Sequence, residues 1–456
     1  MTRAVALFLA LLMTAVPLAG CTGDDTELNA ANDRIVELES QAETDQAKIA
    51  ELEDEQSNLL ETIGAQTVEL ENLCCTLEEM AIQYQYGYDI GHEDGWYEGY
   101  DLAASSGGII STLDIIMDRG YMKCGIKESQ YGMGYLDSWT GVRSGLDIEY
   151  CRAIAAAIGL NPDTDVDYIP ASGSDRFDKL ASGTIDVLIR TTTWTTSRDA
   201  DLNADFAGIN FYDGQGIMVR SDFITAADAG NSAYGLDGAN ICVGIGTTTE
   251  GNLEDWFSTS GISFASVGVA DAAEANAKFI DGSCDAYTGD MSALVAKKYQ
   301  MVQNGDMYDD EIWIAQELLS KEPLGAATRD NDDDWNDVVA WVWYGMITAE
   351  EMGVTSTNYA SMASDACSGW NDPGMCRLLT ENLGLGTTAN PLSGTWMQDV
   401  LDAVGNYGEA YDRSFCDGSY DGVSGSDAMT GCLISRVGTL NALVSEGGLQ
   451  YAPPMR

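Results

Sequence analysis

The segment Ile185-Asp-Val-Leu-Ile-Arg-Thr-Thr-Thr-Trp-Thr-Thr-Ser-Arg-Asp199 predicts a strand, a helix start and a binding site together. Its apolar beginning, up to Ile189, has the length and composition of a short buried strand. Thr196 and Asp199 have the spacing of a capping box, which predicts that a helix begins there. Free N–H groups at a helix start bind anions, and Arg198 can hold a carboxylate through two parallel hydrogen bonds. The segment therefore indicates an anion site; a surface arginine on a polar turn is the alternative.

Strand and helix patterns alternate along the chain from about residue 111 onward. Alternation of this kind predicts an α/β fold in which helices cover largely parallel sheets. The predicted strands are 121–126, 166–169, 185–189 and 239–244, and the predicted helices are 146–158, 177–180 and 338–352.

The composition excludes several classes of function. The chain has 456 residues and a formal net charge of −51, from 22 Lys and Arg against 73 Asp and Glu. Such a surface repels phosphate backbones, so we expect no nucleic-acid partner. The chain has a single histidine, His92, and no Cys-x-x-Cys pair, so we expect neither histidine-based catalysis nor a metal site. We expect no cofactor.

The N-terminus has the pattern of an export signal. Arg3 precedes an apolar run that ends at Leu18, and small residues then lead to Cys21. This predicts a signal peptide over residues 1–20, too short to span a membrane comfortably. Leu18-Ala-Gly-Cys21 resembles a lipobox, so we expect lipidation of Cys21 and an extracytoplasmic protein anchored to the outer face of the cell membrane. An ordinary cleaved signal with an incidental cysteine is the alternative.

A heptad pattern runs over residues 28–83 without a proline. Its apolar seam, with a few polar interruptions, predicts a coiled-coil stalk and hence a homo-oligomer through this segment. A single amphipathic stalk helix is the alternative. Residues 21–27 would then form a tether, and the Gly- and Tyr-rich residues 84–110 a linker.

Seven later segments together carry a family resemblance. They are Gly145–Arg152, Ile185–Trp194, Phe211–Arg220, Cys242–Glu250, Ser320–Gly325, Ala403–Glu409 and Gly448–Arg456. In these segments, and in their order, the chain resembles the polar amino-acid solute-binding proteins of ABC uptake systems, in the general L-amino-acid-binding subgroup. The resemblance covers residues 111–456 and leaves out the first 110.

The resemblance implies a two-lobed type II periplasmic-binding-protein fold with a hinge and an interlobe cleft, here preceded by the coiled coil. The chain should cross the hinge near 214–220 and 319–325. Lobe 1 would comprise 111–216 and 322–456, and lobe 2 would comprise 217–321. The implied function is capture of a broad range of L-amino acids, polar ones above all, for delivery to the transmembrane subunits of an ABC permease.

The resemblance also assigns roles in the cleft. Arg198 carries over as the clamp for the ligand carboxylate, with Thr193 in support. Thr191 carries over as a backbone acceptor for the ligand ammonium. From lobe 2, the N–H of Thr248 would point at the carboxylate, and Asp290 would pair with the ammonium. An N-cap of the following helix is the alternative for Asp290.

The role of Thr248 rests on a second predicted helix start. Thr247 and Glu250 have the spacing of a capping box. The first N–H groups of such a helix are open to an anion.

Three residues concern the ligand side chain: Arg190, Lys127 and Glu128. Arg190 matches a basic residue typical of the subgroup and could face the side chain; a salt bridge on the cleft rim is the alternative. Where relatives often carry an aromatic wall or an acceptor, this chain has Lys127 and Glu128. Tyr131 and Trp139 are the candidates to replace that wall, and the departure leaves the preferred side chain open.

An exported chain with 11 cysteines predicts disulfide bonds. Two pairs follow from the resemblance, Cys124–Cys151 and Cys242–Cys284. Two more are the nearest remaining neighbours in sequence, Cys367–Cys376 and Cys416–Cys432. Whether Cys74 and Cys75 are bridged or free stays open.

Two other functions remain from the sequence. The same fold hosts exported lyases of the cyclohexadienyl dehydratase type, which would need an acid or base of perturbed pKa in the cleft. A sensor lipoprotein that only reports its ligand is the other. The motifs match the binding subgroup, so we expect no enzyme activity and no catalytic residues.

Overall fold

The computed structural model describes residues 34, 48, 110–368 and 371–456. The second of two compact units in the chain, Gly108–Arg456, contains both longer ranges. The predicted signal peptide, Cys21, the tether, the coiled-coil seam and the linker up to residue 109 lie outside the described residues. Among the described helices, none combines the length and apolar character needed to cross a membrane.

The first sheet has five strands. They are β1 (Met122–Ile126), β5 (Val166–Pro170), β6 (Val187–Leu188), β7 (Ala204–Phe206) and β14 (Ala327–Arg329). Their order is β5-β1-β6-β14-β7. β1 pairs in parallel with β5 and β6, whereas β14 runs antiparallel to β6 and β7. The expectation of largely parallel sheets is therefore met on one side of this sheet only.

Four helices accompany the first sheet: α4 (Thr112–Arg119), α5 (Leu146–Ala157), α6 (Arg176–Ala181) and α7 (Thr196–Asp201). α5 is rich in alanine and almost completely buried, which lets it pack closely between β1 and the C-terminal helices. A small antiparallel sheet lies beside it, formed by β2 (Ser129–Gln130), β3 (Gly134–Leu136) and β4 (Arg143–Ser144).

The second sheet has the order β10-β9-β11-β8-β12, and a further strand, β13, also pairs with β8. The strands are β8 (Phe211–Arg220), β9 (Ala239–Gly244), β10 (Phe264–Val269), β11 (Ala286–Asp290), β12 (Ile312–Ile314) and β13 (Ser320–Leu324). The helices are α8 (Thr248–Ser260), α9 (Ala272–Ile280) and α10 (Met291–Asn304). β9 is parallel to β10 and β11, while β8 is antiparallel to β11, β12 and β13.

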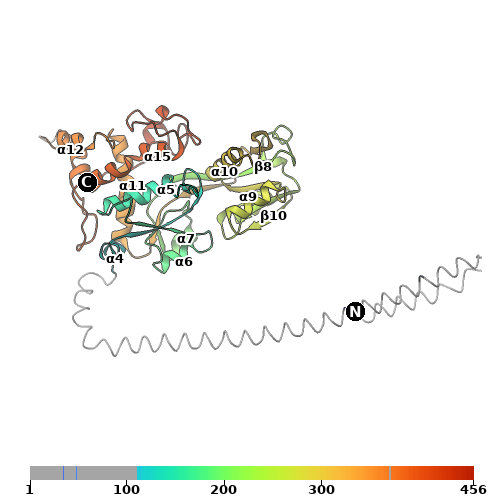
Figure 1. The fold of residues 1–456 in the computed structure, drawn as a ribbon, viewed down its shortest axis with the longest axis horizontal. Coiled ribbons are helices and arrows are strands. Elements are labelled where there is room, and N and C mark those ends of the chain that lie inside the picture. Colours follow the sequence, from blue (N-terminus) through green and yellow to red (C-terminus); the bar gives the residue numbers. More distant parts are fainter. Residues whose placement is uncertain (1–33, 35–47, 49–109, 369–370) are drawn as a thin grey trace, which may run out of the picture. The chain divides into compact units, whose positions relative to one another are not determined.

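β8 and β13 are the strands that link the two sheets, and they run side by side between them (Figure 1). Their register places Asp213 opposite Glu322 and Phe211 opposite Leu324. The lobe boundaries that we propose, after 216 and before 322, fall within these two strands. Each lobe has its own apolar interior, because separate buried clusters lie around the first and second sheets.

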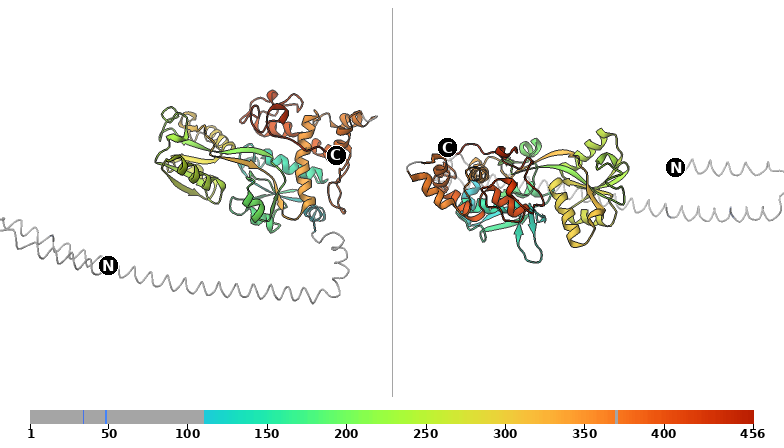
Figure 2. Two further views of the ribbon diagram at one scale, coloured as in Figure 1. Left: turned by 180° about the vertical axis from the view of Figure 1, so that it is seen from behind. Right: turned by 90° about the horizontal axis from the view of Figure 1, so that it is seen from above.

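The C-terminal part packs on the first sheet, away from the second (Figures 1 and 2). Its helices are α11 (Asp333–Glu351), α12 (Tyr359–Cys367), α13 (Pro373–Thr380), α14 (Trp396–Val404) and α15 (Tyr407–Phe415). The side chains of Trp335, Trp343 and Trp396 are fully buried there. This segment also reaches β8, because Asn441 accepts from Tyr212 N at 2.7 Å and donates to Tyr212 O at 2.9 Å.

Most predicted elements occur within one or two residues of their expected bounds. Two differ for identifiable reasons. The strand expected over 185–189 is regular only at Val187–Leu188, where it pairs in parallel with β1 and meets β14 at a single residue pair. The helix expected over 338–352 begins at Asp333, since acidic residues occupy its first turn ahead of the buried Trp335.

Four disulfides join the pairs expected from the sequence: Cys124–Cys151, Cys242–Cys284, Cys367–Cys376 and Cys416–Cys432. The first ties β1 to α5, and the second ties β9 to the turn before β11. The other two lie in the C-terminal part, so each lobe carries at least one cross-link.

The C-terminal part contains a fully buried ion pair that predicts a large mutational effect. Arg436 and Glu350 have side chains 0% and 3% exposed, and Arg436 Nη1 donates to Glu350 Oε2 at 2.9 Å. Arg436→Met should lower the free energy of unfolding by about 3–5 kcal/mol, because it leaves the buried carboxylate of Glu350 without its partner cation. Chemical denaturation followed by circular dichroism measures this.

The matched control is Arg152→Met, which removes a half-exposed pair with Asp163. It should cost no more than about 1 kcal/mol. Equal losses in the two variants would contradict the assignment of Arg436 as a buried stabilising cation.

Candidate ligand-binding cleft

A polar cavity of about 110 Å³ lies between the two sheets and takes its walls from both lobes. Lobe 1 contributes residues of the segments after β1 and β6 and of α6 and α7, and lobe 2 contributes the N-terminal turns of α8 and α10. A wider chamber of about 590 Å³ continues from it. The two share Lys127, Arg190, Gly244, Thr247, Ala272 and Tyr287.

Arg198 lies in the first turn of α7 and lines the inner cavity. Its side chain is buried, and its Nη1 donates to Thr193 O at 2.9 Å. The N-cap of α7 is Thr195, whose hydroxyl accepts from Arg198 N at 3.3 Å, so the predicted cap at Thr196 was wrong by one residue. The remaining guanidinium nitrogens of Arg198 have no partner among the described residues, which leaves them available to an anion.

Thr191 has a strained backbone at the end of β6. Its φ is 44°, in the left-handed region that a β-branched residue rarely adopts. Its N–H donates to the buried Asp147 Oδ2 at 3.2 Å, which holds this conformation in place. Such strain is concentrated at binding sites, where surrounding structure over-determines it. The carbonyl oxygen of Thr191 accepts no hydrogen bond within the described part of the chain.

The N-terminus of α8 faces the cavity from lobe 2. Thr247 is its N-cap, but the predicted capping box does not form. Instead, the Thr247 hydroxyl donates to Gly244 O at 2.6 Å, and Glu250 accepts from Gly246 N at 3.3 Å. Because no side chain caps the first turn, its N–H groups stay open at a position that favours anions.

Asp290 lies at the end of β11 and is the N-cap residue of α10, as the alternative interpretation expected. Its side chain nevertheless makes no capping hydrogen bond, and it has no ion-pair partner among the described residues. Burial raises the pKa of Asp290, as does the Glu322 charge, whereas Lys127 and Arg190 lower it. A carboxylate held in this state is a ready acceptor for a ligand ammonium group.

The inner cavity carries a large excess of positive charge. Its lining includes five basic side chains and one acidic residue: Lys127, Arg176, Arg190, Arg198 and Lys297 against Asp290. Within the described residues, the guanidinium groups of Arg176 and Arg190 have neither a hydrogen bond nor an ion pair, and both Nε atoms are buried without a partner. The rim salt bridge considered for Arg190 is therefore not found in that part of the chain.

Lys127 stands where the inner cavity opens into the wider chamber. Its Nζ donates to Gln130 Oε1 at 2.7 Å. Burial, assisted by repulsion from Arg190, lowers the pKa of Lys127 to about 7. This amine is therefore a titratable cation in the physiological range.

Several residues of the site were not identified from the sequence. The proposed aromatic replacements were wrong: Trp139 is 95% exposed, and Tyr131 packs on Tyr135 and Tyr299, outside both cavities. Tyr287 provides the aromatic wall of both cavities instead. Tyr287 lies three residues before Asp290 in the same strand, and this proximity to a predicted site residue could have identified it from the sequence.

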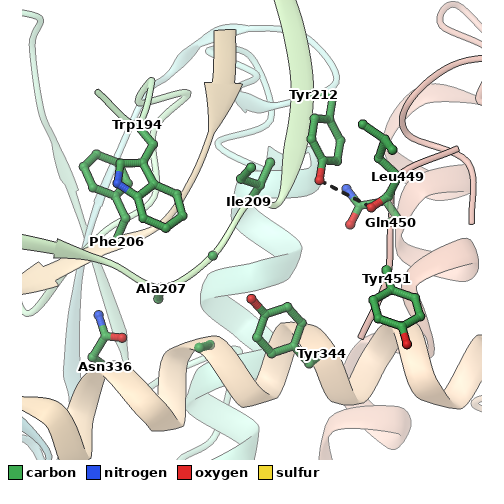
Figure 3. A pocket seen from close by; sticks show the side chains of 12 residues that line it. Trp194, Phe206, Ala207, Ile209, Tyr212, Asn336, Tyr344, Leu449, Gln450 and Tyr451 are labelled. Carbon is green, nitrogen blue, oxygen red and sulfur yellow. Dashed lines mark hydrogen bonds between the residues drawn. The ribbon is translucent and has the colours of Figure 1, made fainter. Parts of the chain in front are cut away.

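A separate cavity of about 320 Å³ lies beside the linking strand β8 (Figure 3). It is lined by aromatic rings, including Trp194, which stacks on Phe206 with a centroid distance of 5.5 Å. Tyr212 Oη donates to Leu449 O across it at 3.3 Å. No charged side chain lines it, so it does not suit a zwitterion.

Together, the cleft residues suit a small zwitterion with an additional negative group. Arg198 and the α8 N-terminus supply donors for a carboxylate, and Asp290 and Thr191 O supply acceptors for an ammonium. The other cations remain for the rest of the ligand.

The chain is similar to known extracellular binding proteins. The model of the bacterial extracellular solute-binding proteins, family 3, matches residues 122–361. The chain is 39% identical over 346 residues to the glutamate/glutamine/aspartate/asparagine-binding protein BztA of Rhodobacter capsulatus, covering 76% of this chain and 94% of BztA. It is 38% identical over 348 residues to the general L-amino acid-binding periplasmic protein AapJ of Rhizobium johnstonii, covering 76% of this chain and 93% of AapJ.

The chain is also similar to a periplasmic binding protein of known structure. The ABC transporter periplasmic binding protein from Brucella ovis with glutathione bound is 39% identical and superposes with a TM-score of 0.66, covering 76% of this chain and 100% of that one. The two-sheet fold is therefore that of a periplasmic binding protein.

The geometry predicts that both ends of the inner cavity are needed for an α-amino acid. Arg198→Met and Asp290→Asn should each weaken binding by about 2–5 kcal/mol, because each leaves a ligand charge buried without its partner. This corresponds to a loss of roughly 30-fold or more in affinity. Isothermal titration calorimetry measures it, with Arg152→Met as a control that should bind normally. A variant of either residue that binds like the unaltered protein would remove it from the site.

Proposed function

Because this chain belongs to the family 3 bacterial extracellular solute-binding proteins, we propose that it captures L-amino acids outside the cytoplasm and delivers them to the permease of an ABC uptake system. The observation that carries the proposal is the pairing of unsatisfied opposite charges, Arg198 and Asp290, on opposite sides of one cleft. Its relatives are binding proteins, and this chain is a binding protein rather than an enzyme.

In the proposed complex, the ligand carboxylate binds Arg198 and Thr193 from lobe 1 and the N–H of Thr248 from lobe 2. The ligand ammonium binds Asp290 and the carbonyl oxygen of Thr191. Since the groups come from both lobes, a bound amino acid stabilises the closed arrangement over any in which the lobes are apart. Closure then excludes water, which strengthens each of these contacts.

The side-chain preference follows from the excess charge. A zwitterionic backbone neutralises one cation and one anion, Arg198 and Asp290, so the other four basic residues remain uncompensated: Lys127, Arg176, Arg190 and Lys297. Arg190 and Lys127 line both cavities, where a side chain leaving the inner cavity would pass. A second carboxylate at this position would be held by charge-assisted hydrogen bonds. We therefore propose polar L-amino acids as ligands, with the acidic ones bound most tightly.

The cellular setting is also a proposal. The export signal, lipidation at Cys21 and the coiled-coil stalk rest on sequence patterns in residues 1–83. They would hold the binding unit at the outer face of the membrane, where it can meet the permease.

A thermal-shift screen of the chain against the common L-amino acids tests the function directly. A ligand that binds only the folded state raises its stability, by about 2.7 kcal/mol at a hundredfold excess over the dissociation constant. Stabilisation by glutamate and aspartate above all, and none by arginine or lysine, is the expected pattern. A folded protein that responds to no amino acid would overturn the proposal.

The role of Arg190 gives a sharper prediction. Arg190→Met should weaken glutamate binding by about 1.5–3 kcal/mol, since a charged hydrogen bond is lost, and should change glutamine binding much less. Titration calorimetry with both ligands gives the ratio. If both affinities fall equally, Arg190 does not contact the side chain.

Lys127 predicts a pH dependence. Its pKa is about 7 in the free protein, and a bound side-chain carboxylate would raise it. Binding of glutamate then takes up a proton above pH 7, so its affinity should fall as the pH rises from about 6 to about 8. The ratio of glutamate to glutamine affinity should fall over this range in the unaltered protein and fall less steeply in Lys127→Met, where Arg176 and Lys297, whose pKa values burial lowers to about 8, still titrate. Equal slopes in the two proteins would exclude Lys127 from the side-chain site.

A further inference from the structure

Two acidic residues face each other across the linking strands. Asp213 in β8 is in register with Glu322 in β13. Directly opposed residues of an antiparallel pair lie on the same face. Glu322 is 1% exposed and Asp213 is half-buried. Neither has an ion-pair partner among the described residues, so neutral donors must stabilise them.

The donors to Glu322 come from both lobes. Thr193 Oγ1, in lobe 1, donates to its Oε2, as does Thr248 Oγ1 from α8 at 3.3 Å. Asn252 Nδ2, one turn further along α8, donates to Oε1 at 3.0 Å, and Ser320 Oγ donates to the same atom at 2.6 Å. A buried carboxylate is costly unless such bonds persist. Its stability therefore depends on lobe 1 and α8 lying close together.

Glu322 is connected through Thr193 to Arg198, the residue that we propose binds the ligand carboxylate. Thr193 donates its hydroxyl to Glu322 and accepts Arg198 Nη1 on its carbonyl oxygen. Thr248, whose N–H we assign to the ligand carboxylate, is held by the same Glu322 oxygen. The groups that meet the ligand carboxylate from the two lobes are thus joined through one side chain.

Asp213 makes the corresponding connection to the other half of the site. Ser292, the second residue of α10, donates to it through both its hydroxyl and its N–H, the latter at 3.3 Å. The Ser292 hydroxyl accepts from Gln130 Nε2 at 3.0 Å, and Gln130 accepts from Lys127. This chain of bonds joins the start of α10, where Asp290 lies, to Lys127 in lobe 1.

We propose that Asp213 and Glu322 form a hinge carboxylate pair, which positions the ligand-binding groups of the two lobes and favours the closed arrangement. Both are positioning residues, since neither lines the cavity. Opening the lobes would separate Glu322 from Thr193 or from α8, and Asp213 from Ser292 or Gln130. The ligand then closes a site whose two halves are already joined at the hinge. The inference rests on the proposed function only for the identity of the ligand.

Glu322→Gln keeps the shape and removes the charge. We expect it to weaken L-glutamate binding roughly tenfold or more, because hydrogen bonds to a charged acceptor are lost. Asp213→Asn should act in the same direction. The matched control is Glu317→Gln, whose carboxylate accepts from Ser232 Oγ at 2.7 Å and Ala233 N at 2.8 Å. All three of these residues lie within lobe 2, so the control should bind glutamate normally.

A variant of Asn252 distinguishes a positioning role of Glu322 from a general loss of structure. It donates to Glu322 and lines neither cavity. Asn252→Ala should weaken glutamate binding several-fold, but combined with Glu322→Gln it should add little to the loss that Glu322→Gln causes alone. Losses that multiply fully would contradict action through Glu322. If Glu322→Gln fails to fold, the glutamate affinity of Asn252→Ala is compared with that of Glu317→Gln. A weaker affinity in Asn252→Ala supports the positioning role, and equal affinities contradict it.

Small-angle X-ray scattering of the ligand-free proteins tests closure independently of any ligand. Glu322→Gln should have a larger radius of gyration than the unaltered protein and Glu317→Gln. If the unaltered protein binds no amino acid, the proposed function fails, and this comparison still judges the hinge pair. An unchanged radius of gyration together with unchanged glutamate affinity would overturn the inference.

Discussion

The binding cleft is governed by the cost of burying charges without partners. Arg198 and Asp290 stand on opposite sides of a small cavity, and burial lowers the pKa of the first and raises that of the second. Each is unfavourable in isolation. In the complex that we propose, a single α-amino acid pairs with both, and because one side belongs to each lobe, it does so only when the lobes are close. In that complex, the same pairing of charges favours both ligand binding and lobe closure.

The rest of the fold holds these charges in place. β8 and β13 carry the chain between the sheets, and the C-terminal part fixes the lobe 1 end of β8 through the paired bonds of Asn441 with Tyr212. Thr191 is held in a strained backbone conformation by Asp147, a buried residue in the first turn of α5. Both of these contacts stabilise lobe 1 on its side of the linking strands.

The sequence predicted what depends on local pattern and failed where distant segments meet. The strand at Ala239–Gly244 and the helix from Leu146 follow from hydrophobic runs and alanine content, and Arg198 follows from a strand-to-helix turn. The cap of α7 was misplaced by one residue because Thr195 and Thr196 are equally good caps by type. Glu322 was overlooked because its hydrogen-bond donors lie in three separate segments, around Thr193, in the first turns of α8 and at Ser320, which only the folded structure brings together. The aromatic wall was sought near Lys127, whereas the second lobe provides it.

The pairing of the ligand ammonium group with Asp290 is tested most directly by changing the ligand and leaving the protein unaltered. Titration calorimetry should compare L-glutamate with N-acetyl-L-glutamate, which keeps both carboxylates but has no ammonium group. If Asp290 and Thr191 hold the ammonium, the acetylated ligand leaves a buried carboxylate unpaired and should bind at least about 30-fold more weakly. Equal affinity for the two ligands would show that the site recognises carboxylates alone, and would contradict the pairing of Arg198 and Asp290 on which the account rests.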